Sequence, residues 1–139
     1  MKKAAITFLF IALSMFAHAQ NRDFDGLWIG NLATSDNKSL NVTLYIEDNN
    51  VYSVTENDEG ERIKDRDKEV GWSKGYGEQL NYVWMNKGGV WTETQTYSLV
   101  WINENKLSVY YFRHVSNLDE TADVNTDWGY TGTGFLYKE

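Results

Sequence analysis

Apolar and polar residues alternate with a period of two along most of the chain from Asp23 onward. In the segment 40–47, for example, every second residue is apolar, and the residues between them are Asn41, Thr43, Tyr45 and Glu47. No stretch of a dozen residues in this part shows clean helical periodicity. Alternation of this kind gives a strand one apolar and one polar face, so the pattern predicts an all-β domain.

Turn-forming residues divide this region into about eight strands. Tight turns are predicted at 48–50, 87–89 and 103–106, where Asp, Asn and Gly tolerate positive φ. The segment 57–69 mixes charges of both signs and is interpreted as a solvated loop or an exposed hairpin tip. The predicted strands are 24–34, 40–47, 51–56, 70–74, 80–86, 90–102, 107–116 and 127–137.

Eight short antiparallel strands in about 120 residues suit one closed up-and-down β-barrel, because closure removes the exposed strand edges. A β-sandwich is the alternative. The sequence therefore predicts a single β-barrel domain over residues 20–139, too small to divide into two domains.

The register of two hairpins predicts which residues face the barrel interior. With Gly88 and Gly89 at the centre of one turn, and Glu104 and Asn105 at the centre of the next, both hairpins give the same grouping. The Thr-rich face, which includes Arg113, suits solvent. A one-residue bulge would exchange the faces beyond it. The predicted inner residues are Leu80, Tyr82, Trp84, Trp91, Glu93, Gln95, Tyr97, Leu99, Trp101, Tyr110, Phe112 and His114.

This register places Tyr82, Gln95 and His114 in one row across three strands, with Glu93 one step along. Burying an unpaired carboxylate is costly, so Glu93 is expected to be hydrated, paired, or used to hold a polar ligand group. A self-satisfied structural network and a ligand site both fit. The ligand-site hypothesis has Trp84, Trp91, Tyr97 and Phe112 as walls, and Tyr82, Glu93, Gln95 and His114 as polar contacts.

The first nineteen residues have the features of an export signal. Lys2 and Lys3 precede the apolar run 4–17, and Ala17-His18-Ala19 is typical of a cleavage site before Gln20. We therefore expect a signal peptide at 1–19 and a secreted or periplasmic protein with no membrane span after cleavage. Cleavage removes two lysines, so the number of basic residues falls from 13 to 11 while the number of acidic residues stays at 20. The net charge therefore changes from −7 to −9. Such a charge disfavours nucleic-acid partners.

Conventional catalytic and metal-binding motifs are missing from the predicted mature sequence. It has one histidine, His114, and no cysteine, so a zinc site with several nitrogen or sulfur ligands cannot be built. No Gly-x-Ser-x-Gly motif occurs, and nothing defines a second carboxylate for a glycosidase using Glu93. The sequence predicts neither an enzyme nor a cofactor nor a metal site.

The segment Asp25-Gly26-Leu27-Trp28-Ile29-Gly30 resembles the Gly-x-Trp opening of the calycin barrels, the group of lipocalins, fatty-acid-binding proteins and avidins. The resemblance implies a barrel that binds a small, mostly apolar molecule in its lumen. It also implies that Trp28 packs across the closed end beneath a basic residue from a late strand, for which Arg113 and Lys138 are the candidates.

Together these features predict an exported barrel that carries or senses a small apolar or aromatic ligand. The alternative is a protein-binding module, such as an inhibitor or accessory subunit of an exported enzyme, with a solid aromatic core. A lumen above about 300 Å³ would favour the ligand-binding hypothesis. A filled core with an exposed aromatic patch would favour the protein-binding alternative.

Overall fold

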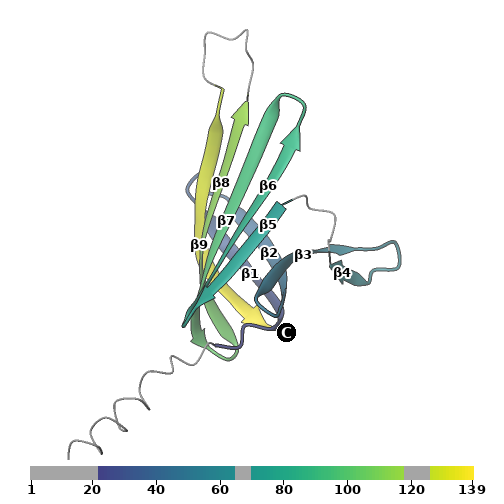
Figure 1. Ribbon diagram of the computed structural model, residues 1–139, viewed down its shortest axis with the longest axis vertical. Coiled ribbons are helices and arrows are strands. Elements are labelled where there is room, and N and C mark those ends of the chain that lie inside the picture. The colour runs from purple at the N-terminus through teal and green to yellow at the C-terminus, as the bar shows by residue number, and fades with distance from the viewer. Residues whose placement is uncertain (1–21, 65–69, 118–125) are drawn as a thin grey trace, which may run out of the picture.

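The computed structural model describes residues 22–64, 70–117 and 126–139, and within them it forms nine strands (Figure 1). The predicted signal peptide lies outside the described residues. In that part of the chain, no helix is long and apolar enough to cross a membrane. The strands are β1 (Gly26–Thr34), β2 (Ser39–Glu47), β3 (Asn50–Glu56), β4 (Arg62–Lys64), β5 (Val70–Tyr76), β6 (Gln79–Gly88), β7 (Trp91–Asn103), β8 (Lys106–Asn117) and β9 (Trp128–Lys138).

All strands belong to one antiparallel sheet with the order β4-β3-β2-β1-β9-β8-β7-β6-β5. Chain neighbours pair throughout except between β4 and β5, and the last strand pairs with the first. The hydrogen-bonded sheet is not closed within the described residues, although β3 and β5 approach one another and bring its two ends together. The predicted all-β, up-and-down fold is confirmed, and the open sheet is compatible with both the barrel and the sandwich.

Each of the eight predicted strands is found within one or two residues of its expected bounds. The ninth, β4, lies in the charged segment interpreted as a loop or hairpin tip, and pairs with the end of β3. The predicted turn before β3 is also present, with Asp48 and Asn49 at φ values of 52° and 61°. The alternation of apolar residues was therefore sufficient to locate eight of the nine strands.

The β6–β7 turn is displaced by one residue from its predicted position. Gly88 pairs with Trp91, so Gly89 and Val90 form the turn instead of Gly88 and Gly89. The indole of Trp91 lies over Gly88, where an added Cβ would be only 2.2 Å from the indole nitrogen. The glycine therefore accommodates the indole across the hairpin. Because the pairing changes by two residues, the predicted faces of β6 and β7 are unaltered.

A β-bulge between Trp101 and Asn103 changes the register of β7 against β8. The turn itself has the predicted Glu104-Asn105 centre, with Asn103 opposite Lys106, but Trp101 lies opposite Leu107. The extra residue, Ile102, exchanges the two faces of β8 relative to the prediction.

The inner face of the sheet is the face that carries the buried apolar core. On β8 the bulge places Leu107, Val109 and Tyr111 on this face, and all three are buried. The core also includes residues from β1, β2, β3, β6, β7 and β9. We call the end of the sheet at which β9 ends, at the bottom of Figure 1, its lower end. Its fully buried members include Phe24, Trp28, Leu32, Ile46, Leu80, Leu99, Leu107 and Leu136.

The segment before β1 covers this lower end. Phe24 packs edge-on against Trp101 at a ring-centroid distance of 5.5 Å, and its carbonyl accepts a 2.7 Å hydrogen bond from the indole nitrogen of Trp28. The Lys138 Nζ lies 5.5 Å from the centroid of a Trp28 ring. The Lys138 side chain also lies next to Gly26, whose φ of 134° is a backbone conformation that other residues rarely adopt. The lower end is therefore tightly filled.

A candidate ligand site at the upper end of the sheet

The inner face of β6 and β7 carries six of the eight predicted site residues. Glu93 is only 7% exposed although it is acidic. Tyr82, Trp84 and Tyr97 are also buried, whereas Trp91 and Gln95 are half-buried. The structure thus brings together Tyr82, Trp84, Trp91, Glu93, Gln95 and Tyr97 on one face, as the register analysis predicted.

The placement of Phe112 and His114 on the inner face is wrong, and the bulge at Ile102 is the reason. Both residues lie on the outer face of β8, where Phe112 is 39% exposed and its ring stacks on that of His114. The predicted row of tyrosine, glutamine and histidine therefore does not form. Gln95 lies opposite Trp84 on one side and Arg113 on the other.

Arg113 takes the inner position that had been predicted for His114. Its Nε lies 2.6 Å from Oε1 of Glu93, and the Gln95 amide donates a 2.6 Å hydrogen bond to the same oxygen. A carboxylate is stable in such a place when it is both ion-paired and hydrogen-bonded. Glu93 was expected to be hydrated, paired or used to hold a ligand group, and the structure shows it paired with Arg113.

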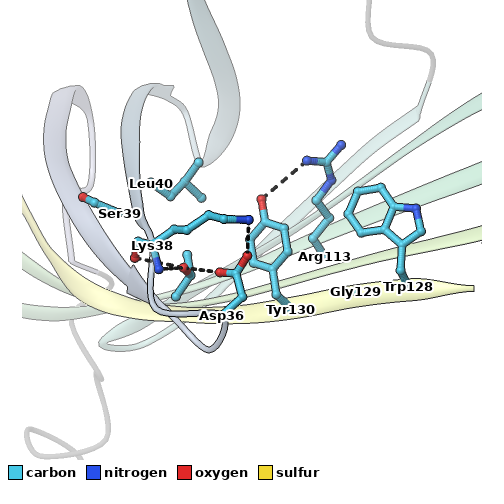
Figure 2. Close-up of a pocket in the computed structure, with 9 residues that line it drawn as sticks. Asp36, Lys38, Ser39, Leu40, Arg113, Trp128, Gly129 and Tyr130 are labelled. Atoms are coloured by element: carbon cyan, nitrogen blue, oxygen red, sulfur yellow. Dashed lines mark hydrogen bonds and ion pairs between the residues drawn. The ribbon is translucent and has the colours of Figure 1, made fainter.

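Two aromatic rings of β9 hold the guanidinium of Arg113. Its Cζ lies 5.0 Å from the Trp128 ring centroid and 5.9 Å from that of Tyr130. Nη1 donates a 3.4 Å hydrogen bond to the Tyr130 hydroxyl (Figure 2). Burial lowers the pKa of Arg113, but the hydrogen bond to Tyr130 and the charge of Glu93 outweigh it and raise the pKa above its usual value. Arg113 is a fixed cation at neutral pH.

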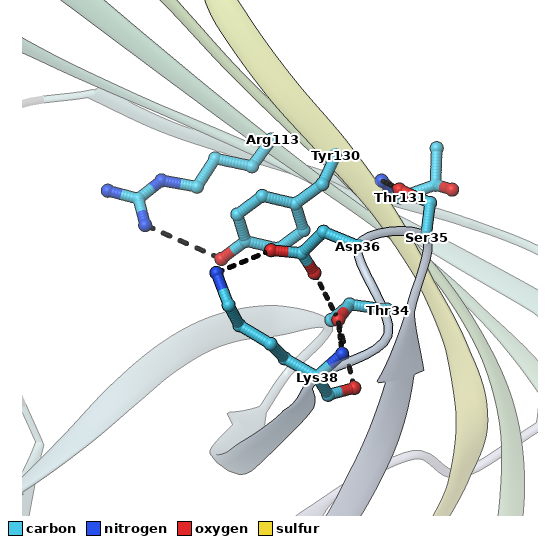
Figure 3. A network of polar contacts seen from close by, with 7 residues as sticks. All are labelled: Thr34, Ser35, Asp36, Lys38, Arg113, Tyr130 and Thr131. Atoms are coloured by element: carbon cyan, nitrogen blue, oxygen red, sulfur yellow. Dashed lines mark hydrogen bonds and ion pairs between the residues drawn. The ribbon is translucent and has the colours of Figure 1, made fainter.

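A second cation, Lys38, reaches this place from the turn between β1 and β2. Its Nζ lies 2.8 Å from Oδ2 of Asp36, whose other oxygen accepts a 2.5 Å hydrogen bond from the Thr34 hydroxyl (Figure 3). The hydrogen bond from Lys38 lowers the pKa of Asp36, and Asp36 in turn raises the pKa of Lys38. The turn is tied to β9 because the Ser35 nitrogen donates to the Thr131 carbonyl. The turn thus presents Lys38 towards Tyr130 (Figure 3).

Two pockets open beside Arg113 and Trp128, which line both. The larger, about 390 Å³, lies between the β1–β2 turn and β9 and is also lined by Asp36, Lys38 and Tyr130 (Figure 2). The smaller, about 290 Å³, extends over the upper ends of β7 and β8. We call the residues Asp36, Lys38, Glu93, Arg113, Trp128 and Tyr130 the upper site.

Four tyrosines cross four adjacent strands on the inner face, and the last of them, Tyr130, belongs to the upper site. The ring centroids are 6.0 Å apart for Tyr82 and Tyr97, 4.7 Å for Tyr97 and Tyr111, and 5.9 Å for Tyr111 and Tyr130. Burial raises the pKa of both Tyr97 and Tyr111 far above the usual value. These hydroxyls are therefore neutral at physiological pH, and they separate the apolar lower core from the charged upper site.

Sequence reasoning missed four members of the upper site, namely Asp36, Lys38, Trp128 and Tyr130, and assigned Arg113 to the opposite face. Alternation on β9 would have placed Trp128 and Tyr130 with the buried Leu136. No local signal in the sequence marks the β1–β2 turn as part of a site. The described residues contain no group of three or more His, Cys, Asp or Glu side chains that could hold a metal ion.

Comparison of the chain with protein-family models, with curated proteins and with solved structures finds no match.

Proposed function

We propose that this protein is an exported small-molecule-binding protein of the calycin type, which binds an apolar or aromatic ligand with an anionic group at the upper site. The observation that carries the proposal is the pocket of about 390 Å³ with Arg113 and Lys38 in its wall. Its volume is within the range of small-ligand sites, which are apolar with a few placed polar groups.

The anionic group follows from the balance of donors and acceptors. Arg113 has five N–H donors, of which one faces Glu93 and one reaches Tyr130, and Lys38 has three, of which one faces Asp36. The pocket of about 390 Å³ is lined by these two cations and by one carboxylate, that of Asp36. A carboxylate or sulfonate between the two cations would accept these donors, and charge-assisted hydrogen bonds of this kind are the strong ones.

The apolar part of the ligand is expected to lie against Trp128, Leu40 and the ring of Tyr130, which line the same pocket. The stack of Trp128 on Arg113 fixes the guanidinium before a ligand arrives, which reduces the ordering cost of binding. A fixed cation beside an aromatic wall favours flat aromatic acids over flexible neutral ligands.

The lower end of the sheet supports the calycin part of the proposal. The tryptophan of the Gly-x-Trp segment is fully buried, and a basic residue of the last strand, Lys138, lies against its ring. Arg113, the other basic residue considered for this role, belongs to the upper site instead.

The test compares two ligands that differ only in charge. Isothermal titration with 2-naphthoate and 2-naphthamide should show the acid binding at least about tenfold more tightly, a difference of about 1.4 kcal/mol. Lys38→Met should reduce this preference, because it removes one of the two cations that line the pocket. The fold should stay intact, because the Lys38 side chain is largely exposed. Lys106→Met is the matched control, since Lys106 lies over Phe135 on the outer face. Equal affinities for the acid and the amide would contradict the proposal.

A further inference from the structure

Within the described strands, the outer face of β6–β9 carries no carboxylate, although the chain has 20 acidic residues. The carboxylate of Asp127, which precedes β9, lies 3.7 Å from His114 at the upper end of this face. Alternation places Thr, Ser, Asn and Gln on this face together with exposed aromatic rings, and its ionisable residues within the described strands are Lys87, Lys106, Tyr110, His114 and Tyr137. Tyr110 is 52% exposed and Phe135 is 44% exposed. Exposed aromatic patches on a soluble protein usually mark a binding surface.

A groove of about 550 Å³ crosses β7, β8 and β9 on this face. Ser108 lies between Val100 and Phe135, and Tyr110 lies between Ser98 and Thr133, so large and small side chains alternate from strand to strand. The hydroxyl residues Ser98, Ser108 and Thr133 line the groove together with the rings of Tyr110 and Phe135. The groove is therefore lined by hydroxyl groups and aromatic rings.

An amide network borders the groove at Ser98. The Gln79 amide donates 2.8 Å hydrogen bonds to Oδ1 of Asn81 and to Oγ of Ser98, and the Ser98 hydroxyl donates a 3.0 Å bond to the same Asn81 oxygen. These contacts fix the side chains at the protein surface without any charged group. Fixed neutral donors and acceptors are suited to a neutral, hydroxyl-rich partner.

We propose that this groove binds a neutral oligosaccharide of hexose units. The C–H faces of a sugar ring pack on the electron-rich faces of aromatic rings, here those of Tyr110 and Phe135. The sugar hydroxyls both donate and accept, as do the side chains of Ser98, Ser108 and Thr133. This site is separate from the upper site, because it lies on the opposite face of the same strands.

The charge distribution favours a neutral partner over a charged one. The acidic side chains of the described residues lie in turns, loops, strand ends and the upper site, and the net charge of the chain is −7, so an acidic polysaccharide would be repelled by the molecule as a whole. A strongly basic partner would find no carboxylate among the residues that line the groove. Among the described residues, Lys106 is the only lysine that contacts an aromatic ring of the groove. Its Nζ lies 4.0 Å from the Phe135 ring centroid.

Titration with cellohexaose, laminarihexaose and maltohexaose tests the proposal, with hexagalacturonate as the acidic comparison. We expect at least one neutral hexasaccharide to bind and hexagalacturonate not to bind. Tyr110→Ala and Phe135→Ala should each weaken the binding about tenfold, which corresponds to about 1.4 kcal/mol. Phe112→Ala is the matched control, because Phe112 is exposed on the same strand as Tyr110 but does not line the groove. It should change the affinity less than about twofold.

Several results would overturn the proposal: no binding of any neutral hexasaccharide, equal binding of hexagalacturonate, or binding that Tyr110→Ala and Phe135→Ala leave unchanged. Sedimentation velocity gives a further test. If the unaltered protein is a dimer and Tyr110→Ala is a monomer, a second copy of the chain covers the groove and the proposal is wrong. Naphthoate affinity should be the same in Tyr110→Ala as in the unaltered protein. The two sites can therefore fail independently.

Discussion

The lower and upper ends of the inner face are built from the same strands but have opposite chemistry. At the lower end, Leu99, Leu107 and Leu136 of β7, β8 and β9 are fully buried with Trp28. At the upper end, the same three strands contribute Glu93, Arg113, Trp128 and Tyr130. The apolar core and the charged upper site thus occupy different ends of the same strands, with the four tyrosines between them.

This difference shows how a small protein without disulfides can carry a charged site inside its sheet. The chain has no cysteine, so packing at the lower end must supply most of the stability. The buried pair of Glu93 and Arg113 adds little by itself, because desolvation offsets most of its attraction. Substitutions at the two ends should therefore have different consequences.

The largest effect is expected at the lower end. Trp28→Ala should reduce the free energy of unfolding by about 3 to 5 kcal/mol, because it removes a fully buried indole and its hydrogen bond to Phe24. Urea unfolding followed by circular dichroism measures the change. A loss below about 1 kcal/mol would mean that the lower end is not the stabilising region.

A smaller loss is expected when the upper site is broken. Arg113→Met should cost about 1 to 3 kcal/mol, because it leaves the Glu93 carboxylate buried beside only Gln95. Adding Glu93→Leu should restore most of that loss, since two apolar side chains need no partners. A double variant that is no more stable than Arg113→Met alone would show that the ion pair itself is stabilising.

The tyrosines between the two ends predict a loss of stability in alkali. Burial raises the pKa of Tyr97 and Tyr111 in the folded protein, whereas unfolded tyrosine ionises near pH 10. The unfolded state therefore loses protons first, and stability falls as the pH rises above about 10, by about 1.4 kcal/mol per pH unit for each tyrosine. Tyr97→Phe should make this decline shallower in urea unfolding between about pH 9 and 11. An unchanged slope would mean that the pKa of Tyr97 is the same in the folded and unfolded protein.

The smallest effect concerns Lys138. Lys138→Met keeps the apolar stem over Trp28 and removes only the charge, so it should cost about 0.5 to 1 kcal/mol in thermal or urea unfolding. Lys74→Met is a suitable control, because Lys74 has a similar contact with Tyr76, whose ring is 61% exposed. Equal losses in the two variants would assign the effect to net charge and not to the contact with Trp28.

The strands could be predicted from the sequence because each long strand alternates apolar and polar residues, as in 40–47. Their pairing was harder to predict. The Gly88–Gly89 turn was misplaced because the fit of the Trp91 ring over Gly88 depends on side-chain packing across the hairpin. The bulge at Ile102 had no local signal, since a Trp-Ile-Asn segment continues a strand as well as it interrupts one.

The candidate site was predictable only as far as the register held. Glu93, Gln95 and the aromatic residues of β6 and β7 were placed correctly, because the shift of that turn preserved the faces. Beyond the bulge, Arg113 and His114 exchanged places. Lys38 and Asp36 join the site through contacts between segments distant in the chain, which no periodic pattern encodes.

The single extra residue at position 102 also has an evolutionary meaning. Ile102 has no partner on β8, so deleting its codon would leave Trp101 opposite Leu107 and Asn103 opposite Lys106 in a regular hairpin. Arg113 would still face inward, and Phe112 and His114 would still face solvent. A residue can thus be gained or lost at this position without exchanging the chemistry of the two faces. Homologous sequences that differ in length by one residue at position 102 should therefore keep the same inward and outward residues along β8.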